Sequence, residues 1–499
     1  MSLNFQKLLI LSCLIFMSVG KAFAVTYYVS PTGTGTGTFA SPMSFSTAIG
    51  KTLTGGDSII LRGGLYSFSA KQTISKSGTA TKYLHIVNYA AEIPVLDFRA
   101  IAYGTAGVSL SGNYVHFKGI TVQGAGDNGL YVTGSYNYIE FCVFRWNSDS
   151  GLQMKTGSDN LIVNCDSYEN FDYKTMDGTT ANYGGNADGF ADKQYTNTGT
   201  NHYKGCRSWR NSDDGWDHYE KVGNTTYDSC WCYANGPASY DMKNHIRFKT
   251  DSASWFVNFA SANYVIKNYG NGNGFKLGGN YTVHNGTLHD CVSVLNTVKG
   301  FDQNNNAGVM NVYNCTGNLN NPDYGFSNSS YGTLVIKNCA TLASKSSNKF
   351  ASKSVTQSNN SWNTGFSCTA ADFSSTDYSV MLNPRQANGA LPEITYLHLK
   401  STSTMIDKGL NLGYTFYGSA PDLGAFEFGL STDLESVTFS ENLDAVFVKS
   451  ESAIHISNYS GNITMTDMLG RVVKRFNNSN AENAFTVQNI QKGIYILKP

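Results

Sequence analysis

The sequence predicts an all-β protein whose main body is a parallel β-helix, followed by a small C-terminal module that is β-sandwich-like. Three observations support this fold class: cysteines that recur about every 24 residues, a second repeat of glycine followed by a large apolar residue, and short segments of alternating polarity. The composition agrees, because the chain has 50 Gly, only 9 Pro and only 14% charged residues. It suits many short strands joined by polar turns.

Seven of the ten cysteines share one register. Their separations are 23, 41, 24, 61, 24 and 24 residues, so most gaps equal one period. The seven are Cys142, Cys165, Cys206, Cys230, Cys291, Cys315 and Cys339. We expect them to stack as buried thiols, because free cysteine behaves as a small hydrophobe. A disulfide framework is the alternative for a secreted chain.

A second ladder runs beside the cysteines. Its members are Gly129-Leu130, Gly151-Leu152, Gly189-Phe190, Gly215-Trp216, Gly274-Phe275, Gly300-Phe301 and Gly325-Phe326. The two long cysteine gaps are then single coils with inserted loops at about 171–186 and 236–270. A leucine-rich repeat would need a Leu-x-x-Leu-x-Leu frame, and a propeller would need about 40 residues per blade. A β-helix of seven indexed coils fits better than either.

The two ends of the helical body, 25–428, are also predicted. Residues 27–31 form an entry strand, 45–49 a short capping helix and 55–66 the first coil, since a solenoid needs a cap over its open core. Residues 421–427 mark the expected end. The tail, 429–499, alternates in polarity and resembles the C-terminal sorting or anchoring modules of secreted Bacteroidetes proteins.

The N-terminus predicts export. Residues 1–24 begin with Lys7, continue through an apolar run and end on small residues, as a secretory signal peptide does. Cys13 fits a lipid-attachment site poorly, because it lies inside that run. No later stretch is long enough to span a bilayer. We therefore expect a monomer that is extracellular or at the surface of a Gram-negative, Bacteroidetes-like cell, with a periplasmic location as the alternative.

Charge excludes one class of partner. The chain has 36 basic and 36 acidic residues, so no nucleic acid or anionic membrane is expected to bind it. Any charge chemistry must be local.

Four aspartates are predicted to meet on neighbouring coils. Asp188 and Asp214 each precede a glycine of the ladder, and equivalent residues of adjacent strands lie about 4.7–4.9 Å apart. Asp213 and Asp217 share the coil of Asp214. Such close carboxylates repel one another unless a cation neutralises them. Calcium suits oxygen ligands, whereas zinc would call for His or Cys. The alternative is that single aspartates cap turns or form hydrogen bonds like those of an asparagine ladder.

Lys276 follows the next ladder glycine by two residues, in the register of Asp217, and Asp302 holds that register one coil further on. The lysine either forms a structural ion pair with Asp217 or Asp302, or acts as a base. A uronate has an acidic C5 hydrogen next to its carboxylate, which a neutral amine could remove while calcium stabilises the developing charge. Calcium would also depress the pKa of the amine.

Four runs around these residues closely resemble polysaccharide lyase family 9, with a similarity that extends over about 27–425. They are GNADGFADK at 185–193, GCRSWRNSDDGWD at 205–217, NGFKLGG at 273–279 and KGFDQN at 299–304. The family contains pectate lyases and rhamnogalacturonan lyases on a right-handed parallel β-helix. The resemblance implies that Asp188, Asp213, Asp214 and Asp217 bind Ca²⁺ and that Lys276 is the base.

The expected substrate is an acidic plant cell-wall polysaccharide, pectate or rhamnogalacturonan I, cleaved by β-elimination. Weaker candidates for contacts with it are Arg207, Arg210, Asp302, Tyr240 and Trp255; the two aromatic residues could equally pack within a loop. Two other functions stay open: a glycoside hydrolase, which needs two suitably spaced carboxylates, and a noncatalytic carbohydrate-binding adhesin.

Overall fold

The computed structural model describes residues 24–177, 180–196, 199–236, 245–247 and 270–429, together with six C-terminal strands. The chain consists of two compact units, Met1–Gly429 and Leu430–Pro499. The predicted signal peptide with Cys13 lies outside the described residues, as do Tyr240 and Trp255. Within the described part, no helix has the length and apolar character needed to cross a membrane.

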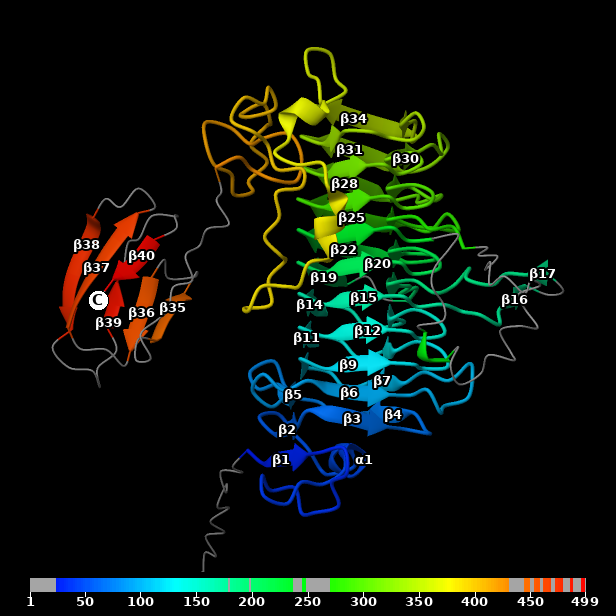
Figure 1. Cartoon of the computed structure of the whole chain (residues 1–499), viewed down its shortest axis with the longest axis vertical. Helices are drawn as coiled ribbons and strands as arrows, with labels where there is room; N and C mark the ends of the chain where they lie inside the picture. Colours follow the sequence, from blue (N-terminus) through cyan, green and yellow to red (C-terminus); the bar gives the residue numbers. More distant parts are fainter. Residues whose placement is uncertain are drawn as a thin grey trace, which may run out of the picture. The chain divides into compact units, whose positions relative to one another are not determined.

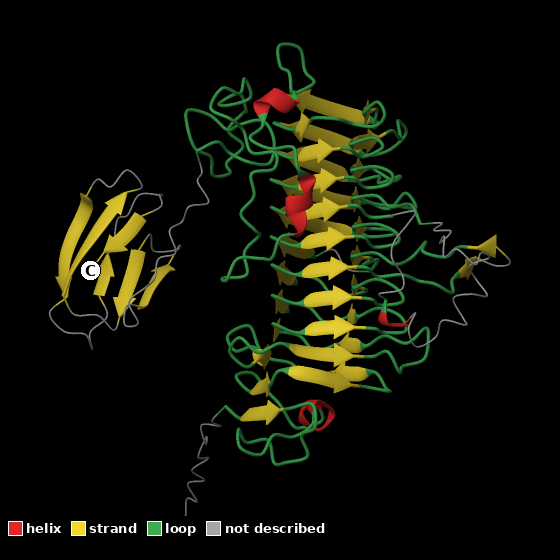
Figure 2. Cartoon of the chain, viewed as in Figure 1, coloured by secondary structure: helices red, strands yellow, loops and turns green. Residues whose placement is uncertain are grey.

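The first unit is a solenoid whose successive coils build three parallel sheets of 12, 10 and 10 strands (Figures 1 and 2). Sheet 1 contains β1 (Thr26–Val29), β2 (Ser58–Leu61), β5 (Leu84–Asn88), β8 (Val115–Lys118), β11 (Tyr138–Glu140), β14 (Leu161–Val163), β19 (Thr200–Lys204), β22 (Gly223–Asp228), β25 (His284–His289), β28 (Val309–Tyr313), β31 (Thr333–Lys337) and β34 (Ser354–Ser358).

Sheet 2 contains β3 (Gly64–Ser67), β6 (Pro94–Asp97), β9 (Thr121–Gln123), β12 (Val143–Arg145), β15 (Asp166–Tyr168), β20 (Arg207–Trp209), β23 (Trp231–Tyr233), β26 (Val292–Val294), β29 (Thr316–Asn318) and β32 (Ala340–Thr341). Sheet 3 contains β4 (Gln72–Ile74), β7 (Val108–Leu110), β10 (Leu130–Val132), β13 (Leu152–Met154), β18 (Phe190–Asp192), β21 (Trp216–Asp217), β24 (Phe275–Lys276), β27 (Phe301–Asp302), β30 (Tyr324–Phe326) and β33 (Lys349–Phe350). These sheets confirm the predicted parallel β-helix.

The N-terminal end is closed as expected. The helix α1 (Phe45–Ile49) begins at Ser44, whose side chain accepts a hydrogen bond from the Thr47 N–H. Its buried residues Phe45 and Ala48 join the apolar core of the solenoid.

The apolar ladder has the predicted register through six coils and differs in the seventh. The rings of Phe190, Trp216, Phe275 and Phe301 stack in order, with centroids 4.7–5.2 Å apart. Phe301 then pairs with Tyr324, so the predicted rung Gly325-Phe326 is wrong. The turn before β30 is one residue shorter, and it places the Tyr324 ring 5.1 Å from Phe301. The Tyr324 ring points inward and fills the core at this position, which Gly325 has no side chain to do.

Thiols and amides form two further columns inside the solenoid. All nine described cysteines are free, which confirms the thiol stack over disulfides. A column of buried asparagines, each five residues after a ladder cysteine, was not anticipated from the sequence. Each side chain donates to the next at 2.8–3.0 Å along the series Asn147, Asn170, Asn211, Asn235, Asn296 and Asn320. This column satisfies buried turn amides that the sheets leave unpaired.

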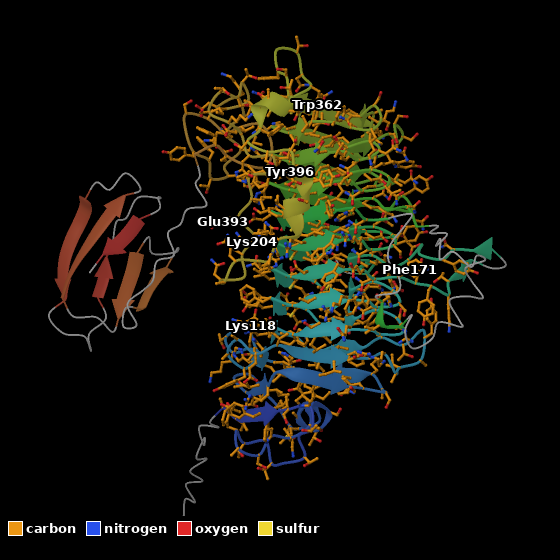
Figure 3. All side chains as sticks on the ribbon, viewed as in Figure 1. Lys118, Phe171, Lys204, Trp362, Glu393 and Tyr396 are labelled. Atoms are coloured by element: carbon orange, nitrogen blue, oxygen red, sulfur yellow. The ribbon has the colours of Figure 1, made fainter. Side chains whose placement is uncertain are left out.

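The solenoid ends earlier than predicted. Its last coil closes with β34, and Trp362 lies at that end of the solenoid (Figure 3), stacked on Phe350 at 4.8 Å. Residues 359–429, with the short 3₁₀ helices η2 (Ala370–Asp372) and η3 (Tyr378–Leu382), form a non-repetitive segment. It packs on the outer face of sheet 2, where Trp231, Val292 and Val294 are apolar and need cover. Residues 421–427 therefore belong to this cover.

The C-terminal unit consists of two three-stranded antiparallel sheets. One contains β35 (Asp444–Val448), β36 (Ala453–Ser457) and β39 (Phe485–Val487); the other contains β38 (Val472–Asn478), β37 (Gly461–Asp467) and β40 (Tyr495–Lys498).

Candidate active site

The predicted aspartates do lie together, at the start of the sheet 3 strands. Phe190 pairs with Trp216, so Asp188 and Asp214 are in register, and the Asp214 N–H donates to Asp188 Oδ1 at 3.1 Å. Glycine follows each of them for a steric reason. A Cβ at Gly189 would collide with Ser208 Oγ and the Gly215 carbonyl.

Asp188, Asp213 and Asp214 form a buried trio in which one carboxylate oxygen from each lies within 4.8 Å of the others. Backbone amides hold the trio in place: Asn271 N–H donates to Asp213 Oδ1 at 2.5 Å, and Asn273 N–H donates to Asp214 Oδ1 at 2.8 Å. These amides fix the carboxylates without neutralising them.

Asp214 Oδ2 is buried. Its close neighbour is the Lys276 ammonium at 2.9 Å, an ionic contact. This oxygen is already paired with one cationic group, and a metal ion would share it with the ammonium or replace the ammonium.

Asp217 lies between two lysines. Its Oδ1 is 3.1 Å from Lys276 Nζ, and its Oδ2 is 2.7 Å from Lys193 Nζ, which also lies 3.0 Å from Asp188 Oδ2. Lys276 pairs in register with Asp217, as predicted. Alternation along the strands predicts that Phe275 and Trp216 point inward and that Asp217 and Lys276 lie on one outer surface. The two aromatic side chains do point into the core, but Asp217 and Lys276 are not on an open surface. Their side chains are only 2% and 9% exposed.

Burial and charge set the pKa values of this cluster. Burial raises the pKa of Asp188 to about 7, opposed by Lys193, and also raises the pKa values of Asp213 and Asp214. Burial would raise the pKa of Asp217 too, but Lys193 and Lys276 outweigh it and lower that pKa.

The pKa of Lys276 is raised by the same carboxylates. Burial lowers it, but the attraction of Asp214 and Asp217 is stronger and raises it well above the ordinary value. Without a further cation, Lys276 is therefore protonated. Neutralising the carboxylates would release this amine as a base.

The residues present fit a hard divalent cation. All donors of the trio are carboxylates, and neither His nor Cys belongs to it among the described residues, so zinc is disfavoured. Four carboxylates face two ammonium groups, which leaves a formal charge of −2 when all six groups are ionised.

The weaker candidates lie elsewhere or have other partners. Asp302 pairs in register with Lys276, but its Oδ1 is 2.9 Å from Lys299 Nζ. Arg207 is buried on sheet 2, where it binds Asp166 at 2.8 Å and the carbonyls of the 359–429 segment. Arg210 lies 3.6 Å from Glu169. The structure does not bring either arginine into the aspartate cluster.

Sequence reasoning missed Lys193. The residue follows the ladder glycine Gly189 by four positions and lies one residue beyond β18, outside the register comparison that identified Lys276. The available signal was its place at the end of the run 185–193, which also contains Asp188.

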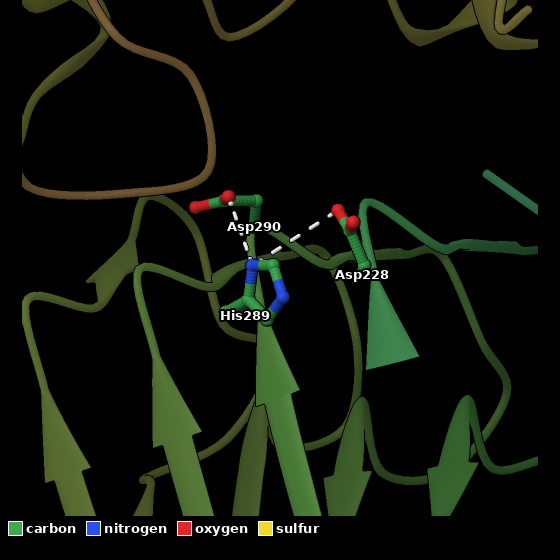
Figure 4. A group of neighbouring side chains, drawn as sticks. All are labelled: Asp228, His289 and Asp290. Atoms are coloured by element: carbon green, nitrogen blue, oxygen red, sulfur yellow. Dashed lines mark hydrogen bonds and ion pairs between the residues drawn. The ribbon is translucent and has the colours of Figure 1, made fainter. Parts of the chain in front are cut away.

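A second group, Asp228, His289 and Asp290, could also hold an ion (Figure 4). Its members are half-buried at the ends of β22 and β25. His289 stacks on Tyr414 with ring centroids 4.1 Å apart, and Lys204 Nζ lies 2.7 Å from Asp228. The side chains of this group are thus held by the ring of Tyr414 and by the Lys204 ammonium, and we assign the group no ligand.

Comparison with known proteins identifies related chains. The family model described as "Pel9A-like, right handed beta helix region" matches residues 27–360, and "Secretion system C-terminal sorting domain" matches residues 444–499. Pectate lyase L of Dickeya chrysanthemi is 36% identical over 444 residues, which cover 85% of this chain and 95% of that protein.

Two solved structures share the architecture. The crystal structure of pectate lyase Pel9A matches with a TM-score of 0.69 and 33% identity, over 82% of this chain and 97% of that one. A rhamnogalacturonan lyase matches with a TM-score of 0.63 and 21% identity, over 76% and 97%, and shows the common fold alone. The chain therefore belongs to the Pel9A-like right-handed β-helix family, polysaccharide lyase family 9, and is a polysaccharide lyase.

Proposed function

We propose that this protein is a secreted, calcium-dependent lyase that cleaves the galacturonate backbone of pectate by β-elimination, with Lys276 as the base. The observation that carries the proposal is the position of Lys276 Nζ, 2.9 Å from Asp214 and 3.1 Å from Asp217, beside a buried carboxylate trio. Asp188, Asp213, Asp214 and Asp217 would hold the ion. A bound Ca²⁺ supplies positive charge that neutralises these carboxylates and favours the charge developing on a uronate carboxylate.

Lys276 takes the proton from C5 of the uronate. The electrons of the C5–H bond form a double bond between C4 and C5, and the C4–O4 bond breaks with its electron pair going to the leaving oxygen, which then takes a proton. Asp214 and Asp217 orient the Lys276 amine, and its side chain, 9% exposed, is largely shielded from water.

Pectate is the favoured polymer because the relatives named pectate lyase are the more similar ones, at 33–36% identity, whereas the rhamnogalacturonan lyase is 21% identical. The match of residues 444–499 to a secretion sorting domain supports export to the cell surface or the medium, where such a polymer is found.

Product analysis tests this proposal. Purified protein is incubated with polygalacturonate and, separately, with rhamnogalacturonan I, with calcium or with a chelator. The expected result is a 4,5-unsaturated uronide that absorbs in the ultraviolet, formed from polygalacturonate and stopped by the chelator. Saturated products made in the presence of chelator would indicate a hydrolase, and binding without turnover would indicate an adhesin. Preference for the other polymer would correct the substrate alone.

A further inference from the structure

We propose that Lys193 is a resident counter-cation that occupies the aspartate cluster of the metal-free protein and must leave when a divalent cation enters. Lys193 would thereby set the calcium concentration at which the enzyme becomes active. This inference rests on the proposed function, because it describes the regulation of the same site.

The contacts of Lys193 place it in competition for the same oxygens. Its Nζ bridges Asp188 and Asp217, at 3.0 and 2.7 Å, and so joins two coils of the solenoid. Asp188 belongs to the carboxylate trio; Asp217 lies outside it, and its two oxygens contact Lys193 and Lys276. An ion that draws Asp217 into the trio would compete with these lysines for its oxygens.

Lys193 is the lysine better able to move. Its side chain is 20% exposed, compared with 9% for Lys276. Lys276 lies within strand β24, whereas Lys193 follows the last residue of β18.

Charge explains why the site would need such a residue. Without Lys193, four buried aspartates would face a single ammonium group. Buried carboxylates that lack counter-charges strongly destabilise a folded protein. Lys193 keeps the empty site folded, and the cost is weaker binding of the divalent ion.

Calcium titration of the full chain, stripped of metal and followed by calorimetry, tests this competition. Lys193→Met removes the charge but keeps most of the side-chain volume. We expect it to bind Ca²⁺ about tenfold more tightly than the wild type, or better. Its metal-free form should melt at a lower temperature and gain more from added Ca²⁺.

The matched control is Lys155→Met. Lys155 holds the same register one coil earlier, since Met154 pairs with Asp192, and its Nζ lies over the ring of Tyr195 at 4.6 Å. Its calcium affinity should equal that of the wild type. Lys193→Arg, which keeps the charge, should bind no more tightly than the wild type and serves if the Met variant does not fold.

Equal or weaker calcium binding by Lys193→Met would overturn the proposed competition while leaving the lyase proposal intact. Absence of calcium binding by the wild type would overturn both proposals. If Lys193→Met binds Ca²⁺ more tightly, as expected, but the Lys276→Ala enzyme stays active, the base assignment alone would be overturned.

Discussion

The asparagine column links the coils of the active site, and Asn235, in the coil of Lys276, bonds to Asn211, in the coil of Asp217. Asn235 Oδ1 accepts two hydrogen bonds from Asn211, one from the backbone N–H at 3.2 Å and one from the side-chain amide at 3.0 Å. Both donors are buried. Asn235→Ala would leave the Asn211 backbone N–H without an acceptor, whereas the Asn211 side-chain amide still donates to the Ser167 carbonyl at 3.2 Å and to Ser208 Oγ at 2.9 Å.

The size of the effect follows from the one donor that is left unsatisfied. An unsatisfied buried donor costs about 1–3 kcal/mol, so Asn235→Ala should lower the free energy of unfolding by about 1–3 kcal/mol. Asn296 Oδ1 adds little to the loss, because it still accepts the backbone N–H of residue 235 at 3.0 Å.

Urea unfolding, followed by circular dichroism, measures this loss as a lower transition midpoint. The control is Asn388→Ala, at an exposed turn where the side chain accepts only a local hydrogen bond from Ala390 N–H at 2.9 Å among the contacts described. If the two variants unfold at the same urea concentration, the column does not stabilise the coils in the way we describe.

Three further predictions follow from particular side chains. Burial raises the pKa of Asp188 to about 7. From about pH 4 to 7, the folded metal-free protein therefore keeps a proton that the unfolded chain has lost. The free energy of unfolding should fall as the pH rises through this window. Thermal melts with and without Ca²⁺ measure this, and a stability that rises over the same window without the ion would contradict the assignment. Arg207→Ala should lower stability by about 3 kcal/mol, because Asp166 loses one of its two arginines, and should leave KM unchanged; a raised KM would restore Arg207 as a substrate contact. Asp302→Asn should turn over pectate at nearly the wild-type rate, since Asp302 binds Lys299 and not Lys276; a large loss of kcat would show that this carboxylate acts in the site.

Repeats carried most of the information that the sequence held about this fold. Stacked coils turn sequence register into position, and the predicted pairs, Asp188 with Asp214 and Asp217 with Lys276, follow from the spacing of glycines alone. Sequence register does not predict side-chain positions where the chain leaves the strands. Lys193 lies beyond β18, and its partners depend on where a flexible side chain can reach.

The cover formed by residues 359–429 was missed for a different reason. This segment has no repeat and contacts sheet 2 from a distant part of the chain, as the bonds from Arg207 to the Met381 and Asn383 carbonyls illustrate. The available signal was the outward apolar pattern of Trp231, Val292 and Val294, which a solvated face would not carry.

The rate of unsaturated-product formation by Lys276→Ala, measured with saturating calcium and polygalacturonate, tests the central claim most directly. A positioned general base contributes about 10²–10⁴-fold, so kcat should fall by about that factor while calcium binding is kept. A variant that binds calcium and retains turnover within about tenfold of the wild type would contradict the assignment of Lys276 as the base.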